Sequence, residues 1–366
     1  MSRIKRAPRV VLTLVLAVLV IAAGAVGWRV LGPYPTGAFA DLDDVDQTMF
    51  RQLSEQFGAA AAHPDEVWTS GWRFERQPLV LLRTSRDGAS QWAHAFLVNM
   101  SDHVDTSGMR PMQLDDLPHL DDVVVSKTYG LTDVWNHLPG ADFDVDDVGG
   151  QPVLVMKYSD GLLRGEVPPA GYGFPTYLVH EDFHATAQQD WTYPEGDAPF
   201  VEGYPTSDEH LDLLRAELAA FDAAHDEASV ARLSEIARDL VSLRLERERR
   251  WPQLTPQASL EKMEGTATYV ERAAARIRGE APELGSMTAA LDHLRQQGQL
   301  QGLERDVFYE TGARLGTILD VLAPDWKARM ADEGSTPFSV LAEAVGVVAA
   351  PDAAELQVLL DGYADA

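Results

Sequence analysis

The segment from residue 180 to residue 184 carries the side chains of a hydrolytic metal site. It reads His180, Glu181, Asp182, Phe183 and His184, so that two histidines stand four residues apart. On a helix these positions share one face, and both imidazoles can then bind one zinc ion. Glu181 lies about 100° around such a helix, where its carboxylate can take a proton from a water molecule at the metal. The spacing predicts a zinc site with Glu181 as general base.

A zinc hydrolase needs a third protein ligand, because the fourth position is left for water. Two glutamates qualify: Glu202 lies 18 residues beyond His184, and Glu264 lies 80 residues beyond it. Glu264 falls within a helix that a Thr-Pro pair is expected to open, and a ligand on a rigid element is preorganised. Glycine and proline disfavour a helix around Glu202. We therefore predict Glu264 as the ligand, and we expect the small residues Gly265 and Ala267 to let its helix approach the HExxH helix.

Composition limits the remaining chemistry. The 366-residue chain has a formal net charge of −27 and contains no cysteine. Without cysteine there are no disulfides, thiolate nucleophiles, cysteine-based zinc sites or iron–sulfur clusters, so any metal must be held by His, Asp and Glu. So acidic a chain repels phosphate groups, and we expect no nucleic-acid partner.

The N-terminus has the pattern of a targeting segment. Residues 10–28 carry no charge and follow several basic residues, a pattern that predicts a single membrane-spanning helix with its start in the cytoplasm. The small residues 23–25 also fit a cleavage site, so a cleaved signal peptide is the alternative. Either way we expect the body outside the cytoplasm, anchored to the cell membrane or, after cleavage, secreted.

The rest of the chain changes character at about residue 170. Before that point, four short runs rich in Val and Leu predict strands of a small sheet, at residues 78–84, 92–100, 122–130 and 152–158. The acidic run Asp142–Asp147 begins like a calcium loop but lacks its glycine and its final glutamate, so we interpret it as a solvated loop.

Helical periodicity is found near the start and dominates the second half. It predicts helices at residues 46–62, 207–224 and 229–251, from residue 255, and at 287–297, 307–322, 338–346 and 352–363. The second and third of these should form a hairpin between the two ligand segments. We predict an α+β protein, divided into a signal anchor (1–30), a linker with a helix (31–66), a β-containing domain (67–170) and a mainly helical, zincin-like catalytic domain (171–366).

Three stretches resemble one family of enzymes. HEDFHATAQQD, EGTATYVE and FYETGARLGTILDVLAPDWK, all within residues 174–330, are similar to the helices of gluzincin metallopeptidases of the peptidase-MA type. The resemblance implies zinc held by His180, His184 and Glu264, with Glu181 as general base. It implies a peptidase and says little about the substrate.

Other polar residues are candidates for supporting roles. A hydrolase of this type needs a donor for the oxyanion, and Tyr309 is the first choice, with His293 and Tyr269 as lesser ones. Glu271 shares a helical face with Glu264 and could orient a ligand histidine. Asp182 stands where zinc peptidases usually have an uncharged residue, so we expect its charge to point away from the metal or to have a partner.

Two functions remain open. The first is a membrane-anchored, extracytoplasmic zinc metallopeptidase that acts on peptide or protein substrates. The alternative is a catalytically inactive binding or scaffold protein that keeps the zincin fold. A di-iron site is a poor reading, because no second Glu-x-x-His occurs in the chain.

Overall fold

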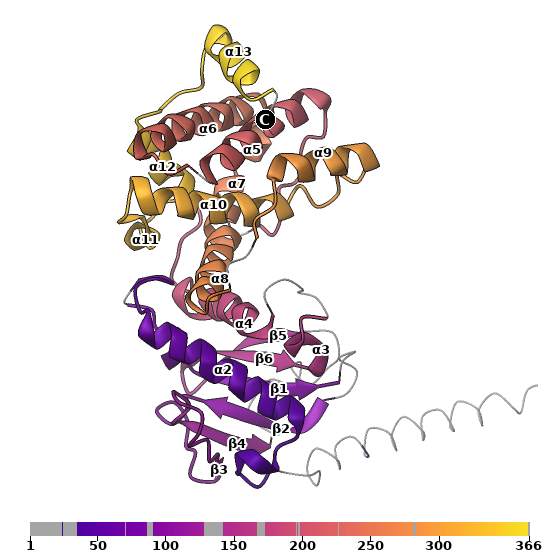
Figure 1. The fold of residues 1–366 in the computed structure, drawn as a ribbon, viewed down its shortest axis with the longest axis vertical. Coiled ribbons are helices and arrows are strands. Elements are labelled where there is room, and N and C mark those ends of the chain that lie inside the picture. The colour runs from indigo at the N-terminus through magenta and orange to yellow at the C-terminus, as the bar shows by residue number, and fades with distance from the viewer. Residues whose placement is uncertain are drawn as a thin grey trace, which may run out of the picture. The chain divides into compact units, whose positions relative to one another are not determined.

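The protein is an α+β protein that folds into two compact units (Figure 1). One unit comprises Met1–Ala61 and Arg73–Leu178, and the other comprises Ala62–Trp72 and Val179–Ala366. The computed structural model describes residue 24 and residues 35–69, 71–85, 91–127, 142–166, 173–194, 196, 198–225, 227–280 and 283–364. Apart from residue 24, the predicted membrane anchor at residues 10–28 lies outside these. Among the described residues, no helix combines the length and the apolar character needed to cross a bilayer.

The first unit is built on a mixed six-stranded sheet with the strand order β3-β4-β2-β1-β6-β5. Its strands are β1 (Leu79–Thr84), β2 (Gln91–Val98), β3 (Arg110–Pro111), β4 (Val123–Lys127), β5 (Phe143–Val148) and β6 (Gln151–Tyr158). The pair β1–β6 is parallel, and the other neighbours are antiparallel. The four predicted strands are confirmed as β1, β2, β4 and β6, because their runs of Val and Leu suit a sheet core.

Strand β5 corrects the interpretation of residues 142–147 as a solvated loop. It pairs with β6 along its whole length, from Phe143 opposite Met156 to Val148 opposite Gln151. The two residues between the strands, Gly149 and Gly150, have φ values of 67° and 84°, as a tight hairpin turn requires. Aspartates are rare in strands, so residue propensity did not predict β5. On an edge strand such charges discourage pairing with other chains.

Helix α2 (Asp44–Ala62) packs on this sheet and confirms the predicted helix at residues 46–62. Its buried face includes Phe50, whose ring lies 4.8 Å from that of Phe96 on β2. The structure therefore groups α2 with the sheet, whereas we expected it to belong to a linker. Short helical segments complete the unit: η1 (Phe39–Asp41), η2 (Phe74–Arg76) and α3 (Asp160–Leu163).

The second unit is helical. Helix α4 (Phe174–Asp182), of which residues from Val179 onward belong to this unit, continues into a π-helical turn, η4 (Phe183–Ala187). The other elements are α5 (Asp208–His225), α6 (Val230–Arg250), η5 (Pro252–Leu254), α7 (Gln257–Leu260), the π-helical turn η6 (Glu261–Gly265), α8 (Thr266–Ile277), α9 (Met287–Gln297), α10 (Asp306–Leu322), α11 (Trp326–Arg329), α12 (Pro337–Val345) and α13 (Ala353–Gly362). The predicted helices are confirmed to within one or two residues at most ends, and α5 and α6 form the predicted hairpin.

A buried ionic network joins this hairpin to η6. Arg244 donates to Glu217 over 2.7 Å and to Glu261 over 2.6 Å. Arg247 also binds Glu217, and it donates to His210 Nε2 over 3.2 Å. All five side chains are buried. Because each charge has a partner of the opposite sign, the network can exist without water, and it fixes η6 against α6.

The closest approach of η6 is to α10. A Cβ atom on Gly312 of α10 would lie 2.6 Å from the Cα atom of Gly265 and 2.7 Å from the carbonyl oxygen of Glu261. Only glycine fits at such a crossing. Our expectation that Gly265 lets its helix approach the HExxH helix is therefore wrong, since its nearest neighbours belong to α10.

An aromatic cluster lies beneath the HExxH segment. The ring of Phe183 lies 4.9 Å from that of Trp68, which in turn lies 5.2 Å from that of Trp326. Tyr269 stacks edge-on against Trp326 at 5.3 Å, and its hydroxyl donates to Asp320. Phe183 is fully buried among these rings, so the cluster holds the HExxH segment in place from the side of Phe183.

Candidate metal centre

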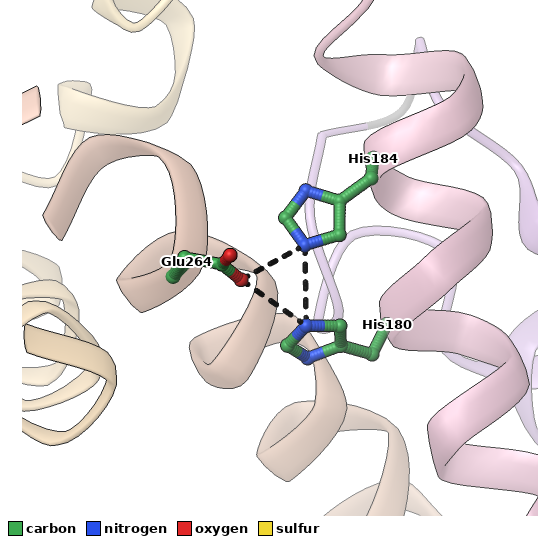
Figure 2. Close-up of side chains that lie close together, drawn as sticks. All are labelled: His180, His184 and Glu264. Carbon is green, nitrogen blue, oxygen red and sulfur yellow. Dashed lines mark hydrogen bonds and ion pairs between the residues drawn. The ribbon is translucent and has the colours of Figure 1, made fainter. Parts of the chain in front are cut away.

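The two histidines of the HExxH segment meet Glu264 from η6 (Figure 2). The Nε2 atoms of His180 and His184 lie 3.2 Å apart. Oε2 of Glu264 lies 3.7 Å from the first and 3.2 Å from the second. The predicted ligands are thus brought together by two segments that are 80 residues apart in the sequence.

The spacing of these three atoms fits one zinc ion. Ligand atoms about 2.0–2.1 Å from a tetrahedral metal lie about 3.3 Å from one another. The three observed separations, 3.2, 3.2 and 3.7 Å, are close to this value. The donor set of two imidazoles and one carboxylate is also one that zinc prefers in hydrolases, with one position left over for water.

The far nitrogen of each histidine is held by another side chain. Nδ1 of His180 lies 3.2 Å from Oε2 of Glu271, and Nδ1 of His184 lies 2.8 Å from Oε1 of Gln188. An acceptor at Nδ1 places the ring proton there and leaves Nε2 with a lone pair for a metal. The contact that we predicted between Glu271 and a ligand histidine is present.

Gln188 is a supporting residue to which the sequence analysis assigned no role. Its amide nitrogen donates to the carbonyl oxygen of Met263 and to the hydroxyl of Thr266, both over 2.8 Å. One side chain thus connects His184 to the backbone before Glu264 and to the Thr266 side chain after it. The signal in the sequence is its position one helical turn after His184, where an amide can face the imidazole.

Proton equilibria in the metal-free site favour an ion pair. Burial opposes the charged form of His180, but bonds to Glu264 and Glu271 and the charge of Glu181 outweigh it and raise the pKa of His180 to about 10. Burial likewise opposes the charge of Glu264, yet its contacts with His180, His184 and Tyr309 hold its pKa well below the usual range. A metal ion would therefore take the place of a proton, as ligation by imidazole requires.

Asp182 lies on the opposite side of the same helix. It is fully buried, and the hydroxyl of Thr186 lies 3.3 Å from its Oδ2 atom. Burial raises the pKa of Asp182 well above its usual value. The side chain thus points away from the two histidines, as we expected, and burial disfavours its charged form.

Glu181 and Tyr309 are both close to the ligands. Glu181 is buried next to His180, as its electrostatic effect on that histidine indicates. The ring of Tyr309 lies 6.4 Å from that of His180 and nearly parallel to it, and its hydroxyl interacts with Glu264. Glycine at position 312, one helical turn after Tyr309, permits the close crossing that brings this part of α10 to η6.

The alternative residues are not part of this group. His293 is bonded to Gln297 on α9, and Tyr269 is engaged with Asp320 in the aromatic cluster. Glu202 lies in an exposed turn and is absent from the set of acidic and imidazole side chains that converge among the described residues. Among the candidates that we named, Glu264 is the third ligand that the geometry favours.

Comparison with known proteins gives no further guidance. No protein-family model matches the chain, and no curated protein or solved structure matches it. The assignment of a function therefore rests on the geometry and chemistry of the site.

Proposed function

We propose that the protein is a zinc-dependent hydrolase that cleaves peptide bonds. The observation that carries the proposal is the triangle of His180 Nε2, His184 Nε2 and Glu264 Oε2, in which both histidines are also held at Nδ1. A zinc ion bound there supplies a Lewis acid, which polarises a carbonyl group and lowers the pKa of water.

The side chains around the triangle have the chemistry that such a reaction needs. Glu181 follows the first ligand directly, so its carboxylate can accept the proton of an attacking water molecule and return it to the leaving amine. The hydroxyl of Tyr309 can donate to the oxygen on which negative charge develops. Both residues are supported by their nearness to the ligands.

The proposal includes a location. The apolar run at residues 10–28 behind a basic start favours a single-pass membrane protein with its body outside the cytoplasm. Substrates are then peptides or proteins of that compartment, and the net charge of −27 argues against nucleic acid.

Metal content is the first test. The purified protein should contain about one zinc ion per chain. Glu264→Gln should lose the metal, because an amide is a much weaker ligand than a carboxylate, whereas Glu202→Gln should keep it. The reverse pattern would move the third ligand to Glu202 and remove the basis of the site described above.

Hydrolysis is the second test. Glu181→Gln should keep zinc and lose at least about 100-fold in the rate of peptide cleavage, since it removes the proton acceptor. A protein that binds zinc but cleaves no peptide in a broad library would instead be the scaffold protein that the sequence left open.

A further inference from the structure

A cation lies beside the metal-binding carboxylate. Nη2 of Arg305 is 3.6 Å from Oε1 of Glu264, whereas the other oxygen of that carboxylate, Oε2, faces the two histidines. The side chain of Arg305 is 50% exposed. A charge that solvent can reach is thus separated from the metal-binding atoms by the width of one carboxylate group.

The orientation of this guanidinium is set by Tyr309. Nη2 of Arg305 donates to the hydroxyl of Tyr309 over 2.5 Å, and the guanidinium carbon lies 5.3 Å from the centre of that ring. An arginine has five N–H donors in a planar fork. Within the part of the chain that the structure describes, the polar contacts of this fork are made through Nη2, so Nη1 and Nε are available to a ligand.

Two other arginines, Arg272 and Arg314, already form ion pairs with carboxylates of the protein. Arg272 is bound to Glu310, and its side chain is 12% exposed. Arg314 is bound to Glu310 and Asp222, and its side chain is 4% exposed. Arg305 differs from both in its exposure and in its contact with a candidate metal ligand. It therefore has the position and the donors to bind a negatively charged group of a substrate.

We propose that Arg305 binds a substrate carboxylate on the residue that follows the cleaved bond. This inference rests on the proposed function and adds a class of substrate to it. The arginine fork matches a carboxylate, with which it forms two parallel hydrogen bonds. An extended peptide advances about 3.3–3.6 Å per residue, so a carboxylate one residue beyond the cleaved carbonyl can reach a cation this close to the metal ligands. The substrate class is peptides with a C-terminal carboxylate at that residue.

The first experiment measures binding without turnover. Full-length, zinc-loaded protein is titrated in a calorimeter with 3-phenylpropanoate and with its amide. The carboxylate should bind more tightly than the amide, and Arg305→Gln should weaken its binding at least about tenfold. Arg329→Gln, which removes an arginine paired with the exposed Glu343, is the control and should change nothing. Unchanged carboxylate binding in Arg305→Gln would overturn the proposal.

Zinc content separates this role from a structural one. If Arg305 served to hold Glu264 in place, Arg305→Gln would lose zinc, and this result would also overturn the proposal. We expect about one zinc per chain in this variant, because both histidine contacts of Glu264 remain. Arg305→Lys should recover part of the carboxylate binding, since it keeps the charge and loses the fork.

The second experiment uses matched peptides. A peptide with a free C-terminus should be cleaved before its last residue, and its C-terminal amide should be cleaved poorly; Arg305→Gln should reduce this preference. A preference for Asp over Asn after the cleaved bond, in amidated peptides, would identify a side-chain carboxylate as the source instead. Cleavage indifferent to either carboxylate would refute the inference and leave the peptidase function standing. Carboxylate binding that depends on Arg305, without cleavage of any peptide, would support the inference about Arg305 and refute the peptidase function.

Discussion

Two glutamates of the same π-helical turn, Glu261 and Glu264, have opposite surroundings. Glu261 is fully buried and receives hydrogen bonds from Arg244 and from the hydroxyl of Thr311. Glu264, three residues later, faces the Nε2 atoms of His180 and His184 and retains some exposure. The turn therefore presents one carboxylate to a closed network and the other to an open site.

The partners explain the difference. Arginine keeps its proton at any ordinary pH and can only donate, so the carboxylate of Glu261 has fixed partners and no position for a metal. Imidazoles can be neutral and then offer lone pairs, so the group around Glu264 can exchange a proton for a metal ion. Both glutamates lie on one π-helical turn, a kind of turn that often occurs at functional sites.

Breaking the closed network should have the largest effect on stability. Arg244→Met leaves the buried charges of Glu217 and Glu261 without their shared partner, so the free energy of unfolding should fall by about 3–5 kcal/mol. Urea denaturation of the metal-free protein measures this loss. On the same helix, Arg232→Met removes an exposed pair with Glu235 and should cost far less, because solvent screens that pair. Equal losses would mean that the network does not hold the fold.

The network should also make the protein sensitive to acid through His210. Burial and the charge of Arg247 lower the pKa of His210 to about 3, whereas an unfolded histidine has a pKa near 6.5. Between these values the unfolded chain binds one more proton than the folded one, so stability falls as the pH falls. From pH 7 to pH 4 this group alone should cost on the order of 3 kcal/mol.

Comparison of variants isolates that contribution. His210→Gln keeps an acceptor for Arg247 and removes the titration, so its stability should decline less from pH 7 to pH 4 than that of the unchanged protein. His293→Gln, at an exposed position of α9, should decline as much as the unchanged protein. Parallel curves for His210→Gln and the unchanged protein would rule out His210 as the source.

A methyl group at the helix crossing should disturb both sides of the turn. Gly312→Ala places a Cβ atom against Gly265 and the carbonyl of Glu261, and such overpacking costs about 1–3 kcal/mol. It should also move Tyr309 away from Glu264, which would lower the rate of cleavage. Gly362→Ala in α13, where a Cβ meets no atom within 4 Å, should be neutral or stabilise by about 0.5–1 kcal/mol. Thermal unfolding of both variants tests the contrast.

Local patterns account for what the sequence predicted well. The spacing of His180 and His184 depends on one helical turn, and most helix ends follow from caps, glycine and proline close by. Glu264 was a choice between two glutamates, made on the rigidity of its expected helix and the family resemblance. These arguments need no knowledge of how distant segments pack.

Long-range packing accounts for what the sequence did not predict. Gln188 and Arg305 have partners that are close only in the folded chain, Met263 in one case and Glu264 in the other. The crossing at Gly265 involves α10, and its sequence gives no sign of which helix it approaches. Strand β5 forms because β6 offers it a ladder, against the propensity of its aspartates.

The smallest effects should come from the residues that hold the far side of each histidine, and they should appear in zinc affinity rather than in stability. Glu271→Leu and Gln188→Leu each remove the acceptor at one Nδ1 atom, so zinc should bind about 10–100-fold more weakly. Glu271→Gln keeps an acceptor and loses only the charge, so its loss should be smaller. Competition with a chelator at fixed pH measures these affinities, and Glu343→Gln, remote from the site, is the control. Arg244→Met should show the reverse pattern, because the folded protein should keep its zinc while its stability falls. If Glu271→Leu also lost stability and kept zinc, Glu271 would belong with the closed network rather than with the metal site.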